Sequence, residues 1–270
     1  MPNTLLNETL GSVIQDERVR AVIERLEAER RGARAGSPHD DGQSQDPYEY
    51  ADRGFSIRPQ QGDLIYLLCR GMRATRVVEF TTSVGMSTLY FAASMRDNGG
   101  GCVIGSELVP AKVATAKRNL GDAGLADYAE IREGDARHTL RDLGGPVDFA
   151  LIDGWPRDEE PSLAREVIEV VAPQLRVGGY VMNDNAEPDF LEFIRDAGNG
   201  FISMTLPLKS GTELSVKVAE FSEARIERDT SMHRLSAFAL PTARSCPGLP
   251  SVTADKFRVT GPPGCWLCRV

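Results

Sequence analysis

Five acidic residues follow short apolar segments of this 270-residue chain, and they are the residues best placed to do chemistry: Glu79, Glu107, Asp135, Asp153 and Asp184. A carboxylate at the end of a strand can accept hydrogen bonds from ribose hydroxyls or coordinate a hard cation. One such acid is ordinary. Five of them at one edge of a sheet indicate a binding site, because parallel strands bring their carboxyl ends together.

The first of these acids opens a turn of small residues, Thr81 to Ser87, that contains Gly85. A strand, a tight turn and a helix bring backbone N–H groups against a polar ligand. An acid after the following strand, here Glu107, is typical of sites that bind the ribose of an adenosine. The G-x-G-x-x-G spacing of pyrophosphate-binding enzymes is absent, which favours an adenosine without a pyrophosphate. An ordinary strand–helix unit is the alternative interpretation.

The hydrophobic pattern predicts the elements that position these residues. We expect helices at 10–34, 64–69, 89–93 and beyond, 110–123, 136–143, 163–175 and 188–195, and strands at 77–78, 102–105, 128–132, 147–153, 179–185, 201–206 and 213–218. Strands that alternate with helices and end in a hairpin predict an α/β fold with a doubly wound, Rossmann-like sheet. The sheet would have seven strands, mostly parallel, with an antiparallel C-terminal hairpin.

Composition narrows the class of protein. A hydrophobic content of 41% is enough for a large core, and the net charge of −8 disfavours a nucleic acid partner. No apolar run reaches the roughly 20 residues that span a bilayer, and the N-terminus lacks the pattern of a secretory signal. The five cysteines are an odd number without a disulfide framework. We therefore expect a cytoplasmic protein with no membrane partner.

Several stretches, taken in order, resemble the class I S-adenosylmethionine-dependent O-methyltransferases, in the bacterial branch related to the caffeoyl-CoA and catechol enzymes. The resemblance covers residues 56–218. Its stretches are Gln60-Gln-Gly, Val78-Glu-Phe-x-x-x-x-Gly-x-Ser, Gly105-Ser-Glu107, Gly134-Asp-Ala136, Asp148-Phe-Ala-Leu-Ile-Asp153, Asp184-Asn185 and Gly211-Thr-Glu-Leu-Ser. Each stretch alone is weak, but together and in order they are specific.

The resemblance implies S-adenosyl-L-methionine as cofactor and a small, aromatic, hydroxylated acceptor as substrate. It also implies that a divalent metal such as Mg²⁺ assists the reaction. Whether the protein forms a homodimer is left open. It places the methionine part over the 79–87 turn, the ribose on Glu107 and the adenine beside Asp135. The implied cofactor-binding residues are Glu79, Phe80, Thr81, Gly85, Ser87, Glu107, Asp135, Ala136 and Asp153. The implied metal ligands are Asp153, Asp184 and Asn185, with Asp153 also catalytic. Such oxygen ligands select Mg²⁺, Ca²⁺ or Mn²⁺.

Two positions depart from the family pattern. Thr81 stands where the family has glycine, so either the turn keeps an ordinary conformation or cofactor affinity is reduced. The lysine base that catechol-type enzymes carry after the first metal-binding Asp is missing, since Asp153 is followed by Gly-Trp-Pro-Arg157. Arginine cannot replace it as a base at neutral pH. Activation of the acceptor would then depend on the metal or on another residue.

Other interpretations stay open. The acids at 153 and 184 could bind cofactor or cap helices without a metal. The protein could bind S-adenosylmethionine without catalysis, methylate a modified RNA nucleoside, or be a nicotinamide oxidoreductase, which the missing glycines disfavour. We expect an N-terminal helix and linker at 1–55, a methyltransferase domain at 56–220 and a poorly ordered extension at 221–270.

Overall fold

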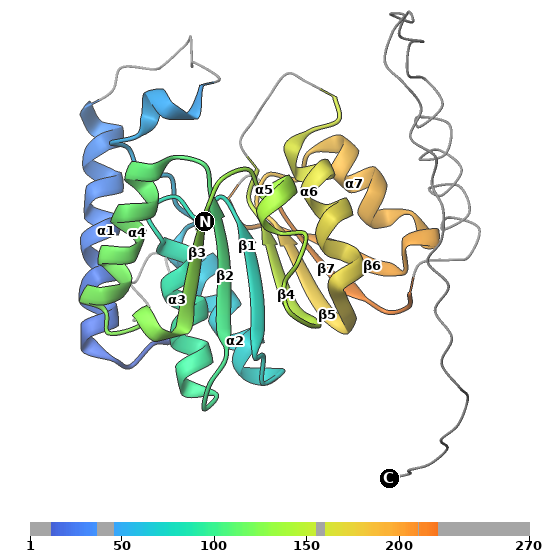
Figure 1. The fold of residues 1–270 in the computed structure, drawn as a ribbon, viewed down its shortest axis with the longest axis horizontal. Coiled ribbons are helices and arrows are strands. Elements are labelled where there is room, and N and C mark those ends of the chain that lie inside the picture. The colour runs from blue at the N-terminus through green and yellow to red at the C-terminus, as the bar shows by residue number, and fades with distance from the viewer. Residues whose placement is uncertain (1–11, 37–45, 155–159, 210, 221–270) are drawn as a thin grey trace, which may run out of the picture. The chain divides into compact units, whose positions relative to one another are not determined.

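A seven-stranded sheet is the frame of the computed structural model, which describes residues 12–36, 46–154, 160–209 and 211–220 (Figure 1). The strands are β1 (Arg76–Phe80), β2 (Cys102–Glu107), β3 (Ala129–Glu133), β4 (Val147–Ile152), β5 (Leu175–Asn183), β6 (Phe201–Leu206) and β7 (Thr212–Lys217). Their order is β3-β2-β1-β4-β5-β7-β6. Strands β1 to β5 pair in parallel, and β7 is antiparallel to both β5 and β6. The predicted fold class is confirmed.

Helices cover both faces of this sheet (Figure 1). They are α1 (Glu17–Gly36), α2 (Pro59–Gly71), α3 (Met86–Asp97), α4 (Pro110–Asp122), α5 (Ala136–Thr139), α6 (Leu163–Val171) and α7 (Pro188–Arg195). Successive strand residues point to opposite faces. Val77 and Phe149 therefore pack in a core with α1 to α4, and their neighbours Val78 and Ala150 pack in a second core with α5 to α7. These two apolar layers hold the strand ends in place.

Several element boundaries differ from the sequence prediction, among them those of α1 and α5. Helix α1 begins at Glu17, after Asp16, whose side chain accepts a hydrogen bond from the backbone N–H of Arg18 at 2.8 Å. Helix α5 ends at Thr139 rather than 143, and the Arg132 side chain satisfies the Thr139 carbonyl at 2.8 Å. The predicted start of the first helix, at residue 10, lies outside the described residues. So does the whole predicted extension at 221–270.

The largest correction concerns the fifth strand. Helix α6 ends at Val171, a short 3₁₀ turn with Pro173 follows, and β5 begins at Leu175 rather than 179. Proline lacks a backbone N–H and its ring clashes with the preceding helical turn, so the helix cannot continue to 175. Leu175 pairs instead with Val147 of β4, ahead of a shift in register.

The parallel strands β1 to β5 end at one edge of the sheet. Phe80 of β1 lies beside Ser106 of β2 and Ile152 of β4, and Ile152 lies beside Asn183 of β5. The acids that follow these strands are therefore brought to one side of the molecule, as the sequence predicts. None of the described helices is long and apolar enough to cross a bilayer.

Candidate active site

A cavity opens where β1, β2 and β3 end. Its lining includes five of the predicted cofactor-binding residues, which are Phe80, Thr81, Glu107, Asp135 and Ala136. Leu163 and Val167 of α6 form an apolar side of the same cavity. An acid beside an apolar slot suits a ligand with a polar sugar and a flat, weakly polar ring.

Glu107 is one of two acids that line this cavity, and it is only 4% exposed. One carboxylate oxygen accepts the backbone N–H of Ser83 at 2.7 Å, and the other accepts that of Val109 at 2.9 Å. These bonds tie the turn after β1 to the turn after β2 and fix the direction of the carboxylate. Each oxygen keeps a second lone pair that can accept a hydrogen bond from a hydroxyl group of a ligand.

Asp135 and Arg137 form a charged pair at the end of β3. The guanidinium of Arg137 bonds the Asp135 carboxylate at 2.6 Å and reaches Glu166 at 3.0 Å. This contact with Arg137 holds the pKa of Asp135 below its ordinary value. Asp135 also caps α5 through the backbone N–H of Arg137 at 2.9 Å. Asp135 thus shapes the cavity and has a structural role as well.

Three other predicted cofactor residues shape the turn and are not part of the cavity lining in the described chain. Glu79 is fully buried and accepts hydrogen bonds from the hydroxyls of Ser87, at 2.7 Å, and Thr88. Burial raises the pKa of Glu79. Gly85 has φ of +88°, and a Cβ there would lie 3.3 Å from Ala116 of α4. The positive φ therefore favours glycine, and a Cβ at this position would be in tight contact with the neighbouring helix.

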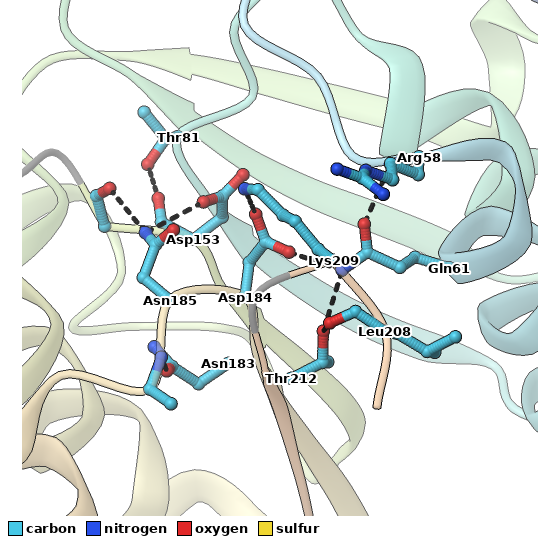
Figure 2. A network of polar contacts seen from close by, with 12 residues as sticks. Arg58, Gln61, Thr81, Asp153, Asn183, Asp184, Asn185, Leu208, Lys209 and Thr212 are labelled. Atoms are coloured by element: carbon cyan, nitrogen blue, oxygen red, sulfur yellow. Dashed lines mark hydrogen bonds and ion pairs between the residues drawn. The ribbon is translucent and has the colours of Figure 1, made fainter. Parts of the chain in front are cut away.

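Thr81 adopts the left-handed conformation, with φ of +67°. The alternative that its turn keeps an ordinary conformation is therefore wrong. Its hydroxyl donates a hydrogen bond to the backbone carbonyl of Asp153, which joins the end of β1 to the end of β4 (Figure 2). The left-handed region costs a β-branched residue of order 1–2 kcal/mol, and this hydrogen bond offsets part of that cost.

A second cluster lies at the ends of β4 and β5, where Figure 2 shows Asp153, Asp184 and Asn185 together. The Asn185 amide nitrogen lies 3.4 Å from an Asp153 carboxylate oxygen and 3.2 Å from the Gly154 carbonyl. Asp184 is 1% exposed, whereas Asn185 is exposed. The structure therefore brings together the three residues that the sequence predicts as metal ligands.

Two further side chains reach Asp184 from distant parts of the chain. Gln61 of α2 donates to one of its carboxylate oxygens, and Lys209 of the β6–β7 turn forms an ion pair with the other (Figure 2). From sequence, Gln61 stands out only as part of a family stretch, and Lys209 does not stand out at all. The one available signal was that Lys209 lies two residues before the Gly211-Thr-Glu-Leu-Ser stretch.

Two carboxylates, those of Asp153 and Asp184, lie close enough in this cluster for their negative charges to repel each other. Burial, together with the negative charge of Asp184, raises the pKa of Asp153 well above its ordinary value, and the ammonium of Lys209 acts in the opposite direction. Glu187 adds a further negative charge nearby. A cation placed between the two aspartates would relieve this repulsion.

The donors in the cluster fit a hard divalent cation. Two carboxylates and one amide supply the oxygen atoms that Mg²⁺ or Mn²⁺ prefers, once the Asn185 amide turns its oxygen inward. Within the described ranges, no group of three His, Cys, Asp or Glu side chains could hold a metal, so the set depends on Asn185. Asn183 stays outside it, because its side chain bonds the Ile152 carbonyl at 3.0 Å and Glu187 at 2.9 Å.

Comparison with known proteins agrees with this architecture. A family profile described as a methyltransferase domain matches residues 78–186, the segment that holds both clusters. The catechol O-methyltransferase of Mycobacterium tuberculosis is 34% identical over 132 residues, which cover 48% of this chain and 57% of that protein. That of Niastella koreensis is 31% identical over 145 residues, with 49% and 63% covered. Residues 78–186 of this chain are therefore similar to a methyltransferase domain.

Solved structures show the same fold over a longer span of the chain. A methyltransferase from Geobacter sulfurreducens superposes with a TM-score of 0.57 at 20% identity, covering 80% of this chain and 94% of that one. The O-methyltransferase from Bacillus cereus in complex with SAH gives 0.55 at 21% identity, covering 79% and 96%. The chain spans less than two thirds of the two catechol O-methyltransferases that it matches in sequence.

Proposed function

We propose that this protein transfers the methyl group of S-adenosylmethionine to a hydroxyl of a small, aromatic acceptor. One observation carries the proposal: the cavity with Glu107 and the Asp153–Asp184–Asn185 cluster lie at the same sheet edge, joined by the hydrogen bond from Thr81 to the Asp153 carbonyl. A cofactor in the cavity would extend past Thr81 toward the cluster, and an acceptor held at the cluster would meet its methyl group there.

The residues of the cavity have separate tasks in this proposal. Glu107 accepts the ribose hydroxyls, while Ala136 and Leu163 cover the faces of the adenine. The 79–87 turn binds the methionine part of the cofactor. Glu79 and Gly85 maintain the shape of this turn and do not themselves contact the ligand. Orientation of two reactants in this way can contribute several kcal/mol to a bimolecular transfer.

The second cluster would hold the acceptor. Asp153, Asp184 and Asn185 would bind a divalent cation. When present, the cation would lower the pKa of the acceptor's hydroxyl group. Thr81 fixes the backbone of Asp153, and Gln61 fixes the side chain of Asp184. The catechol O-methyltransferase relatives suggest a catechol-type acceptor.

Calorimetry with S-adenosylmethionine and with NAD, followed by a screen of catechols and related phenols for methyl transfer, tests the proposal. The screen is run after exhaustive chelation and again after Mg²⁺ or Mn²⁺ is added back, on the natural protein and on Asp184→Ala. We expect loss of transfer on chelation, recovery on add-back, and no recovery in the variant.

Each part of the proposal can fail separately. Binding of S-adenosylmethionine without transfer to any phenol would favour a non-catalytic binding protein. Full activity of the chelated natural protein would remove the metal from the mechanism. Binding of NAD instead of S-adenosylmethionine would overturn the proposed function as a whole.

A further inference from the structure

The two oxygens of the Asp184 carboxylate have different partners. Gln61 donates to Oδ1, and the ammonium of Lys209 contacts Oδ2 (Figure 2). A carboxylate that binds a divalent cation must offer it at least one oxygen. Each oxygen keeps a second lone pair, but an ammonium and a divalent cation at the same carboxylate repel each other. A cation bound between Asp153 and Asp184 would therefore displace the charged donor more readily than the neutral one.

Gln61 is the fixed donor. Its side chain is fully buried, and besides Asp184 it donates to the Thr212 hydroxyl at 3.0 Å and accepts the Arg58 backbone N–H at 2.8 Å. All three contacts would be disturbed if it moved. Burial leaves no solvent nearby to replace them, so loss of these bonds would leave polar groups unsatisfied.

Lys209 is the donor that can leave. Its side chain is 26% exposed while that of Asp184 is 0% exposed, so only the lysine has a path to water. It lies in the turn between β6 and β7 on four flexible methylene groups, and its ammonium can be hydrated outside the site.

The charge of Lys209 acts on the whole acidic cluster. Its ammonium contacts the buried Asp184 carboxylate and offsets part of the negative charge that Asp184 and Asp153 bring together. This is the electrostatic effect that a divalent cation would have at the same place, with one positive charge instead of two.

We propose that Lys209 is an internal counter-ion that competes with the divalent cation for Oδ2 of Asp184 and so sets the affinity of the site for metal. The inference rests on the metal site of the proposed function. When the cation binds, the ammonium leaves for solvent and the carboxylate exchanges one partner for another. When the cation is absent, Lys209 keeps the two aspartates from repelling each other.

The test is direct titration of Mn²⁺ by calorimetry into the full, chelator-treated chain, without any acceptor. Lys209→Met removes the charge but keeps the length of the side chain, and Lys209→Arg keeps the charge. Lys117→Met, at an exposed position on α4, removes a lysine outside the cluster. We expect Lys209→Met to bind Mn²⁺ about tenfold more tightly than the natural protein, equivalent to about 1.4 kcal/mol. Lys209→Arg and Lys117→Met should stay close to the natural protein.

A second readout is thermal unfolding with and without Mn²⁺. Lys209→Met should unfold at a lower temperature than the natural protein in chelator and gain more from Mn²⁺, because its aspartates lack the internal cation. Equal Mn²⁺ affinity in the natural protein and Lys209→Met would overturn the inference while leaving the metal site standing. No Mn²⁺ binding by any variant would overturn both the inference and the metal site, though not the binding of S-adenosylmethionine.

Discussion

Replacement of Glu107 probes the cofactor cavity most directly. In the structure the carboxylate accepts two backbone N–H groups and has lone pairs left for the ribose. Glu107→Ala would remove the proposed hydrogen bond to the ribose. Such a bond to a charged acceptor contributes about 1.5–3 kcal/mol, so we expect roughly a 10- to 150-fold loss of S-adenosylmethionine affinity. It also leaves the N–H groups of Ser83 and Val109 without their partner.

That second effect has its own magnitude. An unsatisfied buried N–H costs about 1–3 kcal/mol, and water from the adjoining cavity would reduce this. Glu107→Ala should therefore lower the stability of the fold as well as the affinity. Glu107→Gln separates the two effects, because its amide oxygen still accepts one N–H while the charge that binds the ribose is gone. We expect intermediate affinity and stability for this variant.

The assay is calorimetric titration of S-adenosylmethionine, with thermal unfolding of each variant to confirm that it is folded. Glu133→Ala is the matched control, since Glu133 is an exposed acid directly opposite Glu107 in the β2–β3 register. It should bind like the natural protein. If folded Glu107→Ala and Glu107→Gln both bind S-adenosylmethionine with unchanged affinity, Glu107 has no part in the site and the placement of the ribose is wrong.

Two further predictions concern the turn after β1 and the end of β3. Thr81→Gly should bind S-adenosylmethionine equally or more tightly, because glycine adopts positive φ without a Cβ; markedly weaker binding in calorimetry would show that Thr81 contributes a contact of its own. Arg137→Met should lower the urea midpoint at pH 7 and lower it less at pH 2. The folded pKa of Asp135 is below its ordinary value of about 3.9, so its contribution is present above that pH and is lost as the pH falls through the folded pKa. An equal effect of Arg137→Met at both pH values would refute this assignment.

The sequence predicted the sheet and the positions of its acids because both depend on local patterns. An apolar segment of strand length that is followed by a polar residue indicates a strand and its approximate end, without knowledge of the neighbouring strands. The order of the strands then follows from the rules for parallel connections, so Asp153 and Asp184 could be placed side by side. Boundaries were less predictable. Pro173 alone gave the signal that the helix before β5 stops at Val171.

The sequence could not reveal which acids serve the ligand and which serve the fold. Glu79 lies one residue before the end of β1, Glu107 is the last residue of β2, and both are buried. Glu79 nevertheless accepts hydrogen bonds from the hydroxyls of Ser87 and Thr88, while Glu107 lines the cavity. The difference is set by the strand partner and by the direction of each turn, which no single segment encodes.

Lys209 is the clearest case of a residue that only the fold can identify. It is 25 residues from Asp184 along the chain, in a turn whose sequence has no charge pattern of its own. Its ammonium reaches the cluster because β7 lies between β5 and β6, which puts the β6–β7 turn at the same edge of the sheet as the end of β5. A lysine base is missing after Asp153, but a lysine does reach the acids from another strand pair. The antiparallel hairpin therefore adds a positive charge to a cluster whose acids all come from the ends of the parallel strands.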